Sequence, residues 1–239
     1  SLAPFFQQAE RRLNVGPWQV PPNENNELLR RGAARLGIPT GAIARTVKGC
    51  WNLGSCGLGC PTNAKQSMLV TTLPAALAQG ATLLVETRAE RFELANGRVR
   101  SLRCEPCRPN GARISGAPGT RVVARHYVLA AGGINSPGVL LRSQAPDPHG
   151  LLGRRTFLHP VVMSAALLPD KVEGWQGAPQ TIYTDHFLDS QPVDGPIGFK
   201  LEAPPIHPVI FASSTAGVGT PQAELLRQFP YTHVLLALL

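Results

Sequence analysis

Residues 127–143, YVLAAGGINSPGVLLRS, predict a strand, a glycine turn and a helix in that order. The apolar run typical of a buried strand covers residues 122–130, and Gly132-Gly133 interrupts it. We expect Asn135 or Ser136 to cap the helix, with Pro137 in the first turn, where a missing N–H is tolerated. A strand, a glycine turn and a helix N-terminus together present free backbone N–H groups. The stretch therefore predicts contact with an anionic group.

The composition is that of a globular protein. The chain has 239 residues, of which 43% are hydrophobic and 16% are charged, enough for one large domain or two small ones. The net charge of +8 is carried mainly by arginines, which occur as scattered short pairs and not as a stripe. We therefore expect no nucleic-acid partner. The longest apolar run, residues 234–239, is too short for a transmembrane segment.

The N-terminal third predicts two helices and then a loop. Residues 1–47 follow the order helix, proline-rich loop, helix, and we expect Asn26 to cap the second helix and Gly37 to end it. Residues 48–67, KGCWNLGSCGLGCPTNAKQS, contain three cysteines and four glycines. So many glycines predict a loop for this segment.

The next segment predicts a short helix and a β-meander. Residues 68–80 predict a helix that ends at Gly80 and turns three apolar side chains inward, which are Leu73, Ala76 and Leu77. Residues 81–105 read as strands with a reversal at Asn96-Gly97, a dipeptide that favours the tight turn of a hairpin.

The pattern of apolar residues changes after residues 127–143. Residues 146–239 contain short apolar runs separated by prolines and glycines, a pattern typical of an antiparallel sheet. We place a domain boundary within residues 146–153.

The cysteine loop is open to several interpretations. Cys50, Cys56 and Cys60 are separated by five and three residues, and no histidine lies near them. Three thiolates are compatible with an iron–sulfur cluster, whereas a zinc site usually has two close pairs or added histidines. A cysteine-bound iron–sulfur or zinc module, serving electron transfer or structure, is therefore an alternative function. We favour small apolar cysteines that pack a tight loop, with no metal.

Three landmarks resemble, in order and spacing, segments of the glucose–methanol–choline (GMC) flavoprotein oxidoreductases. The first is Gly59-Cys60-Pro61 with Ala64-Lys65 and Ser67; the second is Ala131-Gly132, Ser136-Pro137, Leu140-Leu141 and Ser143; the third is His159-Pro160. Two positions depart from the family pattern, because Asn63 and Gln144 stand where the family has glycine. A backbone with positive φ is less easily reached at such positions.

The resemblance implies an α/β (α+β) fold. Part of an FAD-binding Rossmann-like domain, residues 1–150, would join a mostly antiparallel substrate-binding domain, residues 151–239. Within the first, residues 1–47 would form a helical lid segment and residues 48–67 the cysteine loop. The resemblance also implies FAD as the cofactor. The residues that it places near FAD are Ala89, Ala130, Ala131, Gly132 and Asn63, mostly small residues that let the backbone approach closely.

The resemblance further implies the reaction. Family members oxidise an alcohol to an aldehyde or ketone by hydride transfer to flavin N5, while a histidine takes the hydroxyl proton. We expect a small-molecule alcohol as the substrate, and the electron acceptor stays open. The reduced cysteines favour the cytoplasm.

We expect this chain to be the central part of a longer enzyme and inactive by itself. The Gly-x-Gly-x-x-Gly fingerprint is not in the sequence, and neither is the C-terminal segment that carries the family's catalytic histidine. We therefore assign no catalytic residue within the chain. His159, His186 and His207 are expected to be structural.

Overall fold

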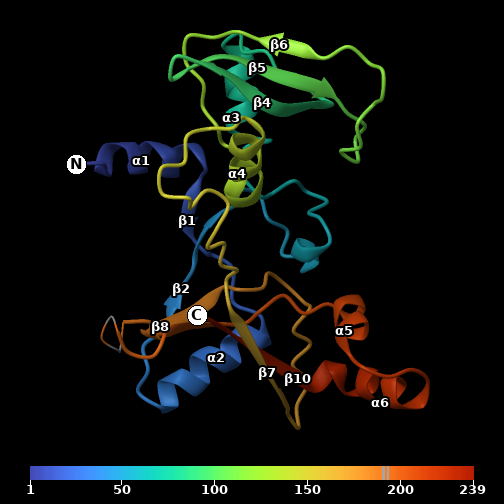
Figure 1. Ribbon diagram of the computed structural model, residues 1–239. Helices are drawn as coiled ribbons and strands as arrows, with labels where there is room; N and C mark the ends of the chain where they lie inside the picture. Colours follow the sequence, from blue (N-terminus) through green and yellow to red (C-terminus); the bar gives the residue numbers. More distant parts are fainter. Residues whose placement is uncertain (190–191, 193) are drawn as a thin grey trace. The chain divides into compact units, whose positions relative to one another are not determined.

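The computed structural model describes residues 1–189, 192 and 194–239 (Figure 1). The chain forms two compact units: unit 1 comprises Ser1–Gln79 with His159–Leu239, and unit 2 comprises Gly80–Leu158. Both units contain helices and strands, which confirms the mixed α and β class. The domain division expected between residues 150 and 151 concerns a complete flavoprotein and stays a prediction.

A five-stranded antiparallel sheet dominates unit 1. Its order is β2 (Gly41–Ala42), β8 (Ile182–Phe187), β9 (Phe199–Glu202), β10 (Thr232–Leu238) and β7 (Val161–Leu167). The antiparallel sheet predicted for the C-terminal part of the sequence is thus confirmed. The pairing of β2 with β8 was not predicted. A second, two-stranded sheet joins β1 (Val15–Pro17) to β3 (Ala44–Thr46).

The helices of unit 1 are short, and α2 (Glu24–Arg35) packs against β8 and β10. Gly37 ends this helix as predicted: its φ is +68°, and the Ile38 N–H donates to the Ala33 carbonyl at 2.9 Å. The remaining helices of the unit are α1 (Ala3–Arg12), α3 (Thr72–Ala78), α5 (Pro208–Ser214), α6 (Thr220–Gln228) and the 3₁₀ turns η1 (Ser55–Gly57) and η2 (Phe229–Tyr231). The inward packing predicted for α3 is wrong. Leu73 and Leu77 are 36% and 45% exposed, because no described element covers that side of the helix.

Three asparagines fasten α2 to the rest of unit 1. The cap is Asn23, whose side chain accepts from the Asn26 N–H, so the helix begins earlier than predicted. Asn26 itself is fully buried, and its Oδ1 accepts the backbone N–H groups of Thr181 at 2.9 Å and Ile182 at 3.2 Å. Asn25, also fully buried, accepts from the Val234 N–H at 3.0 Å. These bonds satisfy backbone groups that would otherwise be buried without partners.

Unit 2 is a three-stranded sheet with one helix packed on it. The strands are β4 (Thr87–Ala95), β5 (Arg98–Pro106) and β6 (Thr120–Val122), and α4 (Gly132–Arg142) packs on β4. The hairpin predicted at Asn96-Gly97 is confirmed, and the two residues have the positive φ values, +52° and +69°, of a tight type I′ turn. The first strand starts at residue 87, so the prediction of a strand over residues 81–86 is wrong.

The strand predicted over residues 122–130 is also wrong beyond Val122. β6 ends at Val122, and Val128 is 89% exposed. No strand in the described part of the chain pairs with residues 127–130, and an extended segment without a ladder partner is not a strand. Tyr127 is held by its side chain instead: its hydroxyl donates to the Arg100 carbonyl at 3.1 Å.

Candidate functional site

The turn at the start of α4 has the properties expected of an anion-binding backbone. The helix begins at Gly132 with Ala131 as its N-cap, so the predicted caps are wrong and Pro137 lies inside the helix. Ser136 still contributes, because its hydroxyl accepts the Ala131 N–H at 3.1 Å. Residues 132–135 carry no charged side chain, and their N–H groups lie at the positive end of the helix dipole.

The backbone of this turn is also exposed. Ala130, Ala131 and Gly132 are exposed. Gly132 has a φ of +81°, and a Cβ built there would meet no heavy atom of the described residues within 4 Å. A nucleotide phosphate or ribose can thus approach the backbone closely, and the residues present fit the ADP half of FAD.

The other end of α4 is fixed to β4 by polar side chains. The Ser143 hydroxyl accepts the Phe92 N–H at 2.8 Å and donates to the Val139 carbonyl at 2.6 Å. Arg142 Nε donates to the Glu90 carbonyl at 2.9 Å. These contacts are buried or partly buried, so they hold the helix, and with it the open turn, in a defined place on the sheet.

The Glu90 carboxylate adds an ionic cluster beneath this helix. It is buried and forms ion pairs with Arg113, with Arg88 at 3.5 Å and with Arg142 at 3.5 Å. A buried carboxylate requires such partners, and Arg113 pairs in addition with Glu105 at 3.3 Å.

Ala89, expected near the adenine, lies in the same strand. It pairs with Cys104 of β5, and the register shifts between Ala89 and Arg91. A bulge at this point changes the direction in which the following side chains point. The structure brings Ala89 and the α4 turn into one unit, while their contact with FAD stays a prediction.

Asn63 lies in the cysteine loop of unit 1. It is exposed and has a φ of +53°, so it adopts the left-handed conformation for which the family has glycine. The loop is anchored on both sides of it: Val47 forms an antiparallel bridge with Lys65, and Asn52 accepts the Ala178 N–H at 2.8 Å. Asn63 is therefore an exposed residue next to a fixed end of the loop.

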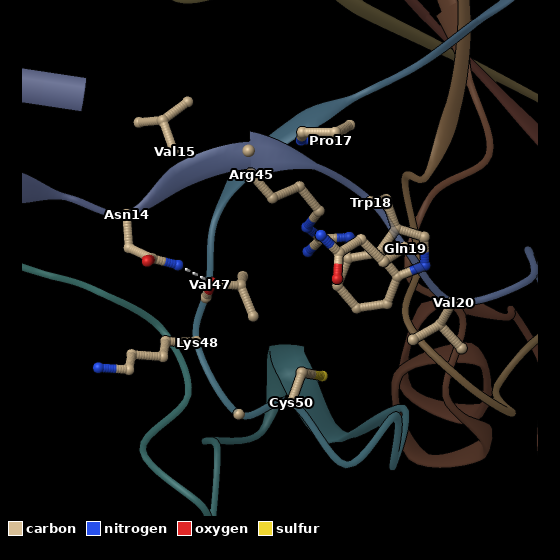
Figure 2. Close-up of a pocket in the computed structure, with 12 residues that line it drawn as sticks. Asn14, Val15, Pro17, Trp18, Gln19, Val20, Arg45, Val47, Lys48 and Cys50 are labelled. Atoms are coloured by element: carbon tan, nitrogen blue, oxygen red, sulfur yellow. Dashed lines mark hydrogen bonds between the residues drawn. The ribbon is translucent and has the colours of Figure 1, made fainter. Parts of the chain in front are cut away.

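Two cavities of unit 1 adjoin this loop and share Trp18, Arg45, Val47 and Cys50. The first, of about 530 Å³, is shown in Figure 2, where the Arg45 guanidinium projects over the ring of Trp18. The guanidinium carbon is 5.0 Å from the ring centroid, a cation–π contact. The second cavity, of about 640 Å³, is lined by Cys50, Cys56, Cys60, Lys65 and Glu202, among others.

Sequence reasoning did not find the pair Trp18 and Arg45. Arg45 lies in β3, and Trp18 directly follows β1, which pairs with that strand. The two residues are distant in the sequence and belong to no local motif, so no pattern signals their contact.

The remaining candidates were the possible metal ligands of the cysteine loop. All five cysteines, each among the described residues, are free thiols. In the described part of the chain, no group of three or more histidine, cysteine or acidic side chains is placed to hold a metal ion. Among the same residues, no helix is long and apolar enough to cross a membrane.

Comparisons with known proteins agree with the landmarks in the sequence. Residues 1–161 match the sequence profile of the family described as GMC oxidoreductase. An uncharacterised GMC-type oxidoreductase of Mycobacterium tuberculosis (strain ATCC 25618 / H37Rv) is 34% identical over 92% of this chain and 32% of its own length. A long-chain-alcohol oxidase of Arabidopsis thaliana is 27% identical over 93% of this chain and 30% of its own length.

The fold has a counterpart among solved structures. Pyridoxine 4-oxidase from Mesorbium loti superimposes with a TM-score of 0.57 and 16% identity, over 94% of this chain and 43% of that one. The chain spans about a third of the length of the curated relatives named above. The match of its first 161 residues to the profile covers well over half of the chain, and on that ground this protein belongs to the GMC oxidoreductase family.

Proposed function

We propose that the chain is part of an FAD-dependent oxidoreductase that oxidises an alcohol to an aldehyde or ketone. The observation that carries the proposal is the family match over residues 1–161, which includes the open turn of α4 and the anchored cysteine loop. The relatives named long-chain-alcohol oxidase support an alcohol as the substrate. A small-molecule substrate agrees with these names, and the electron acceptor stays open.

The chain's own residues would bind and orient the cofactor. The backbone at Ala130, Ala131 and Gly132 would lie against the ADP half of FAD, where the helix N-terminus stabilises negative charge. Ala89 would face the adenine and Asn63 the flavin region, each by its backbone or small side chain. FAD, when bound, supplies the hydride acceptor at flavin N5. We assign the base that takes the hydroxyl proton to the family's C-terminal segment and not to this chain.

Flavin content of the complete gene product tests the proposal. We expect the purified protein to show the visible absorbance of flavin, to release FAD on denaturation, and to lose that absorbance when an alcohol is added without oxygen. A protein that binds no FAD, even after FAD is added, would overturn the proposed function. Cell fractionation tests the cytoplasmic location that we propose on the reduced cysteines.

A pair of variants tests the place of the cofactor. Ala131→Asp puts a carboxylate at the N-cap of α4, where it favours the helix but repels a phosphate. Ala131→Asn is the control, because it caps the helix without a charge. We expect the aspartate to lower FAD affinity about tenfold or more relative to the asparagine. Equal affinities in the two variants would show that no phosphate lies at this turn.

A further inference from the structure

The cysteine loop presents three thiols to one cavity of unit 1. Cys50, Cys56 and Cys60 all line the cavity of about 640 Å³ beside the five-stranded sheet. Cys104 and Cys107, by contrast, lie on or beside β5 of unit 2. The proposed oxidation of alcohols uses none of the three thiols, and the structure leaves all of them free.

Cys60 has the surroundings of a nucleophilic thiolate. It is exposed, its sulfur lies 3.3 Å from the Thr62 hydroxyl, and it accepts the Ala64 N–H at 3.4 Å. The Thr62 hydroxyl, followed by the backbone N–H groups of the loop, lowers the pKa of Cys60 to about 7. Hydrogen-bond donors aimed at an exposed sulfur are typical of cysteines that react with oxidants.

Cys56 lies in a different environment on the same cavity. It sits in the 3₁₀ turn η1, and although the residue is exposed, protein atoms around its sulfur desolvate the thiolate and raise its pKa. The charges of Cys50 and Cys60 raise that pKa further, and all three cysteines line the same cavity. At neutral pH Cys56 is therefore a protonated neighbour of a partly ionised Cys60.

The backbone between these two cysteines can bring them together. Residues 57–59 are Gly-Leu-Gly, and Gly59 has a φ of +108°, a conformation that other residues rarely adopt. A disulfide needs Cα atoms about 4.4–6.8 Å apart, a separation that a linker with two glycines can reach by rotation. The chain is anchored before this linker at Asn52 and after it at Lys65, so the closure would be local.

We propose that Cys60 is a peroxide-modification site and that Cys56 is its resolving thiol. The Cys60 thiolate attacks one oxygen of a hydroperoxide, so that an S–O bond forms and the O–O bond breaks. The second oxygen of the peroxide takes a proton and leaves as water or an alcohol. Sulfur is oxidised by two electrons to the sulfenic acid. The Cys56 thiol then attacks that sulfur. The S–S bond forms as the S–O bond breaks, and the hydroxide leaves with the thiol proton as water.

The test is oxidation of the complete protein with one equivalent of hydrogen peroxide. We expect the loss of two of its thiols within this chain and a Cys56–Cys60 disulfide in a peptide map made without reductant. The Cys56→Ser variant should instead accumulate a sulfenic acid that a dimedone-type probe labels at Cys60. Cys60→Ser should lose both products, whereas the matched control Cys107→Ser should react as the parent protein does.

The pH dependence gives an independent readout. A thiol with a pKa of about 7 is half ionised at pH 7, so its labelling rate should rise only about twofold between pH 7 and pH 9. An ordinary cysteine thiol, with a pKa near 8.5, should rise more than about tenfold over the same range. A tenfold rise at Cys60 would overturn the assignment of the attacking residue.

Other outcomes also overturn the proposal. These are a disulfide to Cys50, no thiol lost to the peroxide, or zinc or iron that co-purifies with the protein and protects the three thiols. Flavin content is measured separately, so a failure here is distinguishable from a failure of the proposed oxidoreductase function.

Discussion

Replacing Asn26 by alanine tests how unit 1 is held together. The Asn26 side chain is fully buried between α2 and the start of β8. Its Oδ1 accepts the N–H groups of Thr181 and Ile182, and its Nδ2 donates to Asn23 Oδ1 at 2.6 Å. Alanine removes these bonds and cannot replace them.

The magnitude follows from the two N–H groups that lose their acceptor. A buried donor left without a partner destabilises a protein by about 1–3 kcal/mol. With two such donors, we expect the free energy of unfolding of unit 1 to fall by about 2–6 kcal/mol. This is a large part of the stability of a typical domain, about 5–15 kcal/mol.

Urea denaturation followed by tryptophan fluorescence measures this loss. The three tryptophans, Trp18, Trp51 and Trp175, all belong to unit 1, so the signal reports that unit alone. With a slope of about 2 kcal/mol per molar urea, the midpoint should shift down by about 1–3 M. Asn135→Ala is the control, because Asn135 is exposed and lies in unit 2. A shift in Asn26→Ala no larger than the control's would refute the reasoning.

Three further predictions follow from backbone geometry and burial. Gln144→Gly should stabilise unit 2 by about 0.5–1 kcal/mol in thermal unfolding followed by circular dichroism, because Gln144 has a φ of +51° after α4; Gln144→Ala should give no gain. Gly54→Ala should destabilise unit 1 by about 2–4 kcal/mol in the urea assay, because φ is +74° and the added Cβ would lie 2.0 Å from the Trp175 carbonyl oxygen; an unchanged midpoint would contradict this. Burial lowers the pKa of His233 from 6.5, so the folded protein favours the neutral imidazole. The resulting contribution to the free energy of unfolding is present above pH 6.5 and is lost as the pH falls below that value. His233→Gln should therefore lose less stability than the parent protein between pH 7 and pH 5 in the same assay.

Local signals in the sequence were sufficient where a single residue type decides the conformation. The Asn96-Gly97 hairpin and the end of α2 at Gly37 were predicted because each requires positive φ, which asparagine and glycine adopt readily. The two departures from the family's glycines follow the same rule. Asn63 and Gln144 both adopt positive φ, the conformation that glycine reaches most easily.

Nonlocal contacts were not predictable in this way. Asn26 was expected to cap a helix, but it bonds Thr181, 155 positions away, and Asn25 bonds Val234, 209 positions away. A sequence pattern carries no information about a partner at that distance. The strand predicted at residues 127–130 failed for a related reason, because an apolar run forms a strand only when a neighbouring strand is present to pair with it.

The candidate site was predicted in its chemistry more than in its geometry. Small residues at positions 130–132 do form an exposed turn at a helix N-terminus, although the helix begins earlier than expected. The contacts of Ala89, Asn63 and this turn with FAD stay predictions. Cys60 was expected to pack a loop or, as the alternative, to bind a metal, because its contacts with the Thr62 hydroxyl and the Ala64 N–H depend on loop geometry that no sequence pattern shows.

Unit 1 is built from two stretches of chain with unit 2 between them, and this order matters while the protein is being made. Unit 2 is continuous, so it can fold as soon as its last residue leaves the ribosome. The sheet of unit 1 has to wait for β10, which pairs with both β7 and β9 and follows unit 2 in the chain. Until then, α2 and its buried asparagines have no strand to bind. Residues 1–79 therefore depend on protection from aggregation until the second stretch of unit 1 has been made.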